Sequence, residues 1–122
     1  MIMKKFFLFA TALLLASCSA QKPNLVSTQK PILNIAANLA QSIEANAGAH
    51  SAWVKNKSQQ PIAFNYNLYW YDENGITQLF STQQEKYQGA LLLQPQQKAE
   101  INLTKPTAES VNYRLYLFSG NN

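Results

Sequence analysis

The sequence is poor in the residues from which catalytic and metal sites are usually built. Its 122 residues include one cysteine, one histidine and four glycines, and only 13% of its residues are charged. One cysteine cannot form an internal disulfide or a cysteine-based zinc site, and one histidine cannot form a histidine cluster. The sequence also lacks a glycine-rich phosphate loop and a Ser/His/Asp order for nucleophilic catalysis. These absences exclude several enzyme classes, and the length supports one small domain.

The N-terminal apolar run is too short to cross a bilayer. Lys4 and Lys5 precede a predominantly apolar run of eleven residues at 6–16, whereas a membrane-spanning helix needs about 20. A basic start, a short apolar run and small residues after it are typical of a secretory signal. We therefore expect residues 1–17 to be a signal peptide.

The end of this segment, Leu15-Ala16-Ser17-Cys18, resembles the bacterial lipobox. In that motif small residues admit the peptidase, and the cysteine sulfur takes a diacylglyceryl group. Because Cys18 is the chain's only cysteine, we expect it to become the lipidated first residue, with palmitate-type acyl chains as a durable membrane anchor. The alternative is an ordinary signal peptide with an incidental cysteine. The next residue is Ser19, not the aspartate of inner-membrane retention, which favours the periplasmic face of the outer membrane.

The segment after the lipobox predicts a tether. Residues 18–30 are mostly polar, contain Pro23 and lack periodicity, so we expect a flexible link to a domain at 31–122. Without the leader, eight basic and six acidic side chains give a net charge of +2. No basic patch is visible, and we expect no nucleic-acid partner.

Alternation of apolar and polar residues predicts a mainly β domain. The strongest strand spans residues 62–71, with one face made by Phe64, Tyr66, Leu68 and Trp70. Asn65, Asn67, Tyr69 and Tyr71 alternate onto the other face. An Asn-Gly turn follows within residues 72–75. Further strands are expected at 52–56, 76–80, 91–93, 99–103 and 111–118. Short strands at this spacing predict a small β-sandwich.

Residues 32–45 allow two interpretations. Ile32, Ile35, Leu39 and Ile43 follow helical spacing, and the alanine-rich composition favours a helix at 36–45. The first four residues could instead begin a strand. We expect a short helical segment, or a strand leading into one helical turn, near the N-terminus of the domain.

Two predicted strands resemble those of a known family. Residues 64–75, an aromatic strand that runs into Tyr-Trp-Tyr-Asp and a glycine turn, look like the central signature of the YcfL family of small periplasmic lipoproteins. Residues 113–117 resemble the family's closing strand, and the lipobox at Cys18 agrees with it. The resemblance covers most of residues 25–118. It implies an immunoglobulin-like β-sandwich on a lipid tether, with no catalytic residues to carry over.

The titratable residues do not suggest an enzyme. We interpret His50 as a surface or strand-entry residue. Asp72 opens a turn, and Glu73 beside it is not placed for paired acid–base work. We expect no catalytic residue, no metal site and no cofactor other than the covalent lipid on Cys18.

Aromatic and basic side chains of two strands form a candidate binding surface. Tyr69, Tyr71, Arg114 and Tyr116 share one face if the last strand lies beside the long one, and tyrosine and arginine are enriched where proteins bind partners. The alternative is that they pack against the alanine-rich segment. We expect a non-enzymatic, lipid-anchored envelope protein that acts through protein contacts. The alternative function is glycan binding, for example to peptidoglycan.

Overall fold

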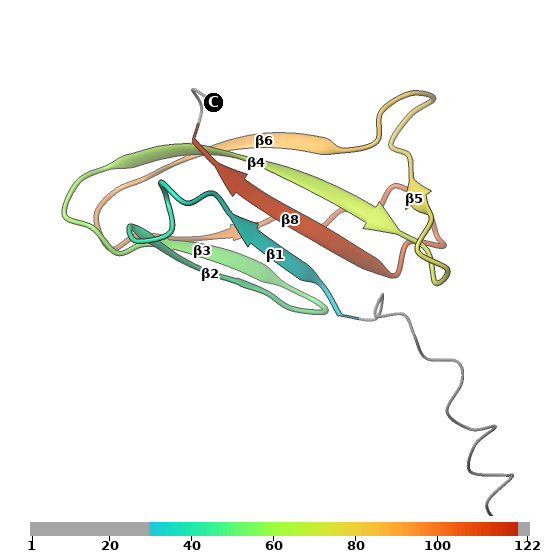
Figure 1. The fold of residues 1–122 in the computed structure, drawn as a ribbon, viewed down its shortest axis with the longest axis horizontal. Coiled ribbons are helices and arrows are strands. Elements are labelled where there is room, and N and C mark those ends of the chain that lie inside the picture. Colours follow the sequence, from blue (N-terminus) through green and yellow to red (C-terminus); the bar gives the residue numbers. More distant parts are fainter. Residues whose placement is uncertain (1–29, 120–122) are drawn as a thin grey trace, which may run out of the picture.

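The computed structural model describes residues 30–119, which form two β-sheets around one hydrophobic core (Figure 1). Cys18 and the segment at 1–17 lie outside these residues. The larger sheet contains β1 (Ile32–Ile35), β8 (Asn112–Phe118), β4 (Ile62–Tyr71), β5 (Thr77–Gln78) and β6 (Tyr87–Leu93). The smaller sheet contains β2 (Ile43–Ala47), β3 (Ala52–Asn56) and β7 (Lys98–Ile101). The prediction of a mainly β sandwich is confirmed at this level.

Strand β4 is the centre of the larger sheet. It pairs antiparallel with β8 along one side, and with β6 and then β5 along the other. Strand β1 pairs in parallel with the far side of β8. The predicted inward face of β4 is confirmed, because Phe64, Tyr66, Leu68 and Trp70 are all buried in the core. A period of two therefore sets which β4 side chains point outward.

The two sheets are joined by apolar packing and by specific hydrogen bonds. Ala52 and Val54 of β3 pack in the same core as the inward face of β4. The Asn56 side-chain amide on β3 donates to the Leu93 carbonyl on β6 at 3.0 Å. At the opposite end of β3, the Tyr113 hydroxyl of β8 donates to the Gly48 carbonyl at 2.6 Å. These bonds hold the larger sheet in a defined orientation over the smaller sheet, and so fix the direction in which its outer face points.

The expected helical segment is wrong, since residues 30–119 contain no helix. Ile32–Ile35 pair with β8 instead, and β2 starts at Ile43. The residues between them make successive turns, with the Leu39 amide donating to the Ala36 carbonyl at 2.9 Å. Once strand pairing takes both ends, the remaining residues are too few for a stable helix. The alternative of a strand leading into a turn describes the chain better.

Several strand limits also differ from the sequence prediction. The last strand was expected to start at Val111, but Val111 precedes β8 and is 57% exposed. Only Thr77 and Gln78 of the expected strand at 76–80 pair with β4. Strand β6 starts at Tyr87, so part of the expected polar connection at 81–89 belongs to the sheet. This extension brings Gln88 and Gly89 beside the centre of β4.

Candidate functional site

The outward side of the larger sheet carries most of the predicted site residues. β4 and β8 run side by side, as expected, with Tyr69 opposite Arg114 and Asn67 opposite Tyr116. We call this surface the tyrosine–amide face and define it by Asn65, Asn67, Tyr69, Tyr71, Arg114, Tyr116 and Phe118. The four predicted site residues are half-buried, not fully exposed. They therefore lie in a sheet surface with restricted side-chain freedom.

Arg114 holds together one end of the tyrosine–amide face. Its guanidinium carbon lies 4.3 Å from the centre of the Tyr69 ring, which is a cation–π contact. Its Nε donates to the Tyr71 hydroxyl at 3.4 Å. The hydrogen bond to Tyr71 raises the pKa of the Arg114 guanidinium above its ordinary value. The guanidinium is thus permanently charged, and two tyrosine side chains fix its position.

A stacked aromatic pair occupies the other end. The Tyr116 and Phe118 rings are 5.0 Å apart and nearly parallel, with an interplanar angle of 17°. Their cross-strand neighbours on β4 are Asn67 and Asn65. The pairing of β8 with β4 therefore places flat apolar rings directly beside amide donors and acceptors.

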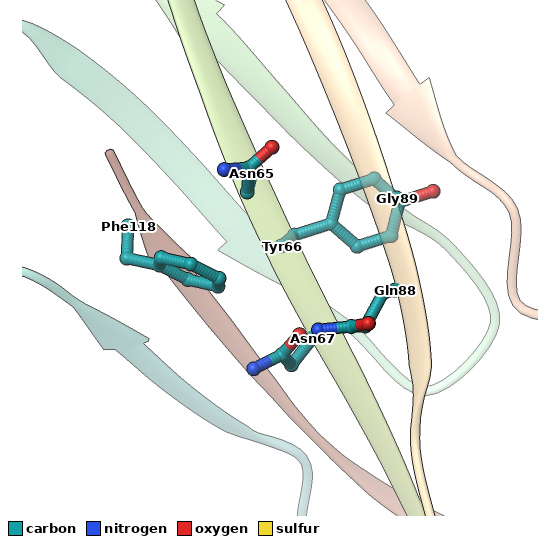
Figure 2. A pocket seen from close by; sticks show the side chains of 6 residues that line it. All are labelled: Asn65, Tyr66, Asn67, Gln88, Gly89 and Phe118. Carbon is teal, nitrogen blue, oxygen red and sulfur yellow. The ribbon is translucent and has the colours of Figure 1, made fainter. Parts of the chain in front are cut away.

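A shallow hollow of about 310 Å³ opens between the Phe118 ring and β6 (Figure 2). Asn65, Asn67, Gln88 and Phe118 line it, together with Tyr66 and Gly89. Asn67 is only 8% exposed, and its amide oxygen is buried with no hydrogen-bond partner in residues 30–119. Buried polar atoms are normally paired, so this oxygen is an unused acceptor at the base of the hollow.

Tyr66 approaches β6 closely at Gly89, beside the hollow. Figure 2 shows the Tyr66 ring extending across the strand at Gly89. A Cβ atom at Gly89 would overlap the ring and hydroxyl of Tyr66. Burial, and next the neighbouring Tyr87, raise the pKa of the Tyr66 hydroxyl above its ordinary value. The Tyr66 hydroxyl therefore stays neutral near neutral pH, and its ring packs against β6 at Gly89.

A second hollow of about 440 Å³ lies beside Tyr69. The residues that connect β5 to β6 supply most of its lining, which consists of Gln83, Gln84, Glu85, Lys86 and Gln88 besides Tyr69. Gln88 borders both hollows, so the polar surface continues from the tyrosine–amide face onto this connection.

The titratable residues His50 and Asp72 both lie in turns. His50 is exposed in the turn between β2 and β3. The Asp72 carboxylate accepts the amides of Asn74 and Ile76, at 2.8 and 3.0 Å, and so closes the turn after β4. Within residues 30–119, no three histidine, cysteine, aspartate or glutamate side chains come together as a metal site. Residues 30–119 include no helix that is long and apolar enough to cross a membrane.

Two functional candidates were not recognised from the sequence. Gln88 lies in a stretch that reads as a polar loop, and only its pairing with Asn67 shows that it belongs to the sheet. Phe118 falls on the same face as Arg114 and Tyr116 by a period of two, so its face was predictable, but its stacking on Tyr116 was not. The first omission concerns a contact between strands that are distant in sequence, and the second concerns a contact between two residues of β8.

The comparisons with known proteins identify relatives without an assigned activity. The profile of a family described as "Protein of unknown function (DUF1425)" matches residues 22–119. An uncharacterized protein of Haemophilus influenzae is 50% identical over 115 residues, which make up 94% of this chain and 99% of that protein.

Two solved structures are similar in fold. A DUF1425 family member from Shewanella sp. pv-4 aligns with a TM-score of 0.50 and 23% identity, over 66% of this chain and 75% of that one. A protein of Campylobacter jejuni aligns with a TM-score of 0.52 and 13% identity, over 77% of this chain and all of that one. At these identities the likeness supports the fold alone.

Proposed function

The chain belongs to DUF1425, a family of proteins of unknown function, and from that premise we propose that it is a lipid-anchored, non-enzymatic protein of the bacterial cell envelope. We further infer that it is YcfL-like, with an immunoglobulin-like sandwich on the periplasmic side of the outer membrane. Two packed sheets, antiparallel except for the pairing of β1 with β8, and the aromatic strand β4 support this classification. The lipobox residues at 15–18 support the anchor.

The proposed activity is binding to another envelope protein through the tyrosine–amide face. The observation that carries it is a guanidinium held by two tyrosines. On the outward side of the sheet, Arg114 contacts the Tyr69 ring and donates a hydrogen bond to the Tyr71 hydroxyl. Arginine and tyrosine side chains held in one conformation lose little entropy when a partner binds. No described group of side chains offers an activated nucleophile with a base, so recognition accounts for this surface better than catalysis.

Crosslinking in intact membranes tests this activity. The full chain carrying Tyr69→Ala and Tyr116→Ala should capture much less partner protein than the wild type, while its melting temperature changes little. A matched control is Lys55→Ala with Glu44→Ala, which alters the outward side of the smaller sheet. Normal capture by a folded tyrosine variant places the functional surface elsewhere, and unfolding of the variant shows that the tyrosines are structural.

The anchor is tested separately with the mature protein isolated from cells. Cys18 should carry the acyl mass at the new N-terminus, and Cys18→Ala should be released from membranes or remain uncleaved. A mature protein with a free thiol and no acyl mass would contradict the lipid anchor. That result would not bear on the binding face.

Glycan binding is the second candidate function. The hollow at Asn65, Asn67, Gln88 and Phe118 favours it, since amide groups beside an aromatic ring suit the hydroxyls and apolar face of a sugar. Sedimentation with purified peptidoglycan should then decrease in Asn65→Ala and Phe118→Ala but not in Lys55→Ala. Equal sedimentation of all three variants counts against the glycan.

A further inference from the structure

Strand β6 forms an open edge of the larger sheet. Among the described residues its strand partner is β4 alone. Its seven residues, Tyr87–Leu93, include no charged residue and no proline. Leu92 is 60% exposed and Tyr87 is 44% exposed. Backbone groups on the free side of such an edge can hydrogen-bond to another strand.

The other edge strands of residues 30–119 carry features that discourage strand pairing. β2 contains Glu44, and β7 contains Lys98 and Glu100. β1 is only four residues long and directly follows Pro31. Charges, proline and shortness are the usual means of protecting an edge. β6 has none of them, which indicates that its edge is covered in the assembled protein.

We propose that β6 pairs antiparallel with β6 of a second copy, so that two larger sheets join across a twofold axis. Figure 1 shows β6 at the outer border of the sheet, beyond β4. Full overlap of the seven residues places Ala90 opposite Ala90 of the second copy. The flanking pairs are Gln88 with Leu92, Gly89 with Leu91, and Tyr87 with Leu93.

This register is self-complementary in charge and in size. No charge on β6 meets a charge of the second copy, because the strand has none. The exposed Leu92 is covered on the outward side, and Leu91 lies opposite Gly89, where it meets the Tyr66 ring that fills this position. A twofold contact uses the same strand on both copies, so it closes as a dimer and leaves no free β6 edge.

Disulfide trapping tests the register in membranes of cells that express the full chain. Cross-strand Cβ atoms lie about 4.5–5.5 Å apart, close to the range a disulfide needs. Ala90→Cys should therefore give an oxidised dimer. Ala63→Cys is the matched control, because Ala63 is also exposed but lies on β4, one strand inward. The protein without either substitution is the control that shows how much disulfide-linked dimer forms through Cys18. Equal dimer in both variants, or none in Ala90→Cys, overturns the register.

Charge swapping tests the same contact in the purified full chain by sedimentation in detergent. Ala90→Lys and Ala90→Glu each place like charges opposite one another, and self-association should weaken about tenfold or more. An equimolar mixture of the two variants should restore the dimer. At dilutions where all the proteins are monomeric, the melting temperatures should agree, since Ala90 is exposed. A monomeric wild type, variants that dimerise normally, or a different chain captured by β6 would each overturn the proposal.

Discussion

Gly89 matters as a single residue because the Tyr66 ring occupies the space where a side chain would be. Gly89→Ala should lower the free energy of unfolding by about 1–3 kcal/mol, since the added Cβ overlaps a ring that is itself only 7% exposed. Urea unfolding of the single variants and of Gly89→Ala with Tyr66→Leu checks this. The double variant should lose less stability than the sum of the two single changes. Strict additivity would show that the ring moves aside at no cost.

Tyr113 is a second residue whose own effect on stability can be measured, through its dependence on pH. Burial raises the pKa of its hydroxyl to about 12, whereas the unfolded chain has the ordinary value of about 10. The unfolded state therefore releases this proton at a lower pH than the folded state does. The stabilisation from Tyr113 is complete below pH 10 and is lost as the pH rises towards about 12.

The measurement is the free energy of urea unfolding of the wild type and of Tyr113→Phe through this pH range. The wild type should lose stability with pH more steeply than the variant, because lysine titration is common to both. The hydrogen bond to Gly48 at 2.6 Å accounts for the advantage of the wild type at lower pH. Parallel curves for the two proteins would contradict a raised pKa at Tyr113.

Among the secondary-structure elements, the connection from β3 to β4 depends on Asn56. Its side-chain amide donates to the carbonyls of Gln60 and Leu93, and its oxygen accepts from the amide and hydroxyl of Ser58. It is fully buried. Because Leu93 belongs to the other sheet, one side chain shapes the loop and also joins the sheets.

Asn56→Ala should therefore destabilise the domain by about 1–3 kcal/mol, the cost of leaving buried carbonyls unpaired. Chemical unfolding monitored by circular dichroism measures the loss. Ser58→Ala is the matched variant, since it removes bonds within the exposed loop and keeps the bond to Leu93. It should cost less than Asn56→Ala. An equal cost would mean that only the loop, and not the link between sheets, contributes to stability.

The molecule as a whole should unfold in one step, because both sheets share a single core. Trp70 belongs to this core, 2% exposed and 5.1 Å from the Tyr113 ring. Trp70→Ala should lower the free energy of unfolding by about 3–5 kcal/mol. That is a large share of the roughly 5–15 kcal/mol that stabilises a typical domain.

Trp70→Phe allows the cooperativity itself to be measured. The Trp70 Nε1 is buried without a partner in residues 30–119, so this change removes no hydrogen bond there. The fluorescence of the remaining tryptophan, Trp53, reports on the smaller sheet, while circular dichroism reports on both sheets. The two transitions should coincide. A separate, later transition of Trp53 would show that the smaller sheet is stable by itself.

Local pattern alone predicted strands β3 and β4 and the two faces of β4. Alternation in residues 62–71 is enough to decide which side chains face the core, since a strand that slips by one residue would expose its whole apolar set. The same alternation placed Tyr69 and Tyr71 on the side opposite Trp70, and Arg114 and Tyr116 on one face of the last strand. These parts of the candidate site needed only short-range information.

Contacts between distant strands decided the rest. Residues 32–35 have helical spacing, yet parallel pairing with β8 makes them a strand. Gln88 reads as loop, yet pairing with Asn67 makes it part of the hollow. The free edge of β6 is likewise defined by which strands lie beside it. The sequence by itself determined the faces of single strands, because their period is local. Only the tertiary structure decided which strands are neighbours, because that choice depends on burial summed over the whole core.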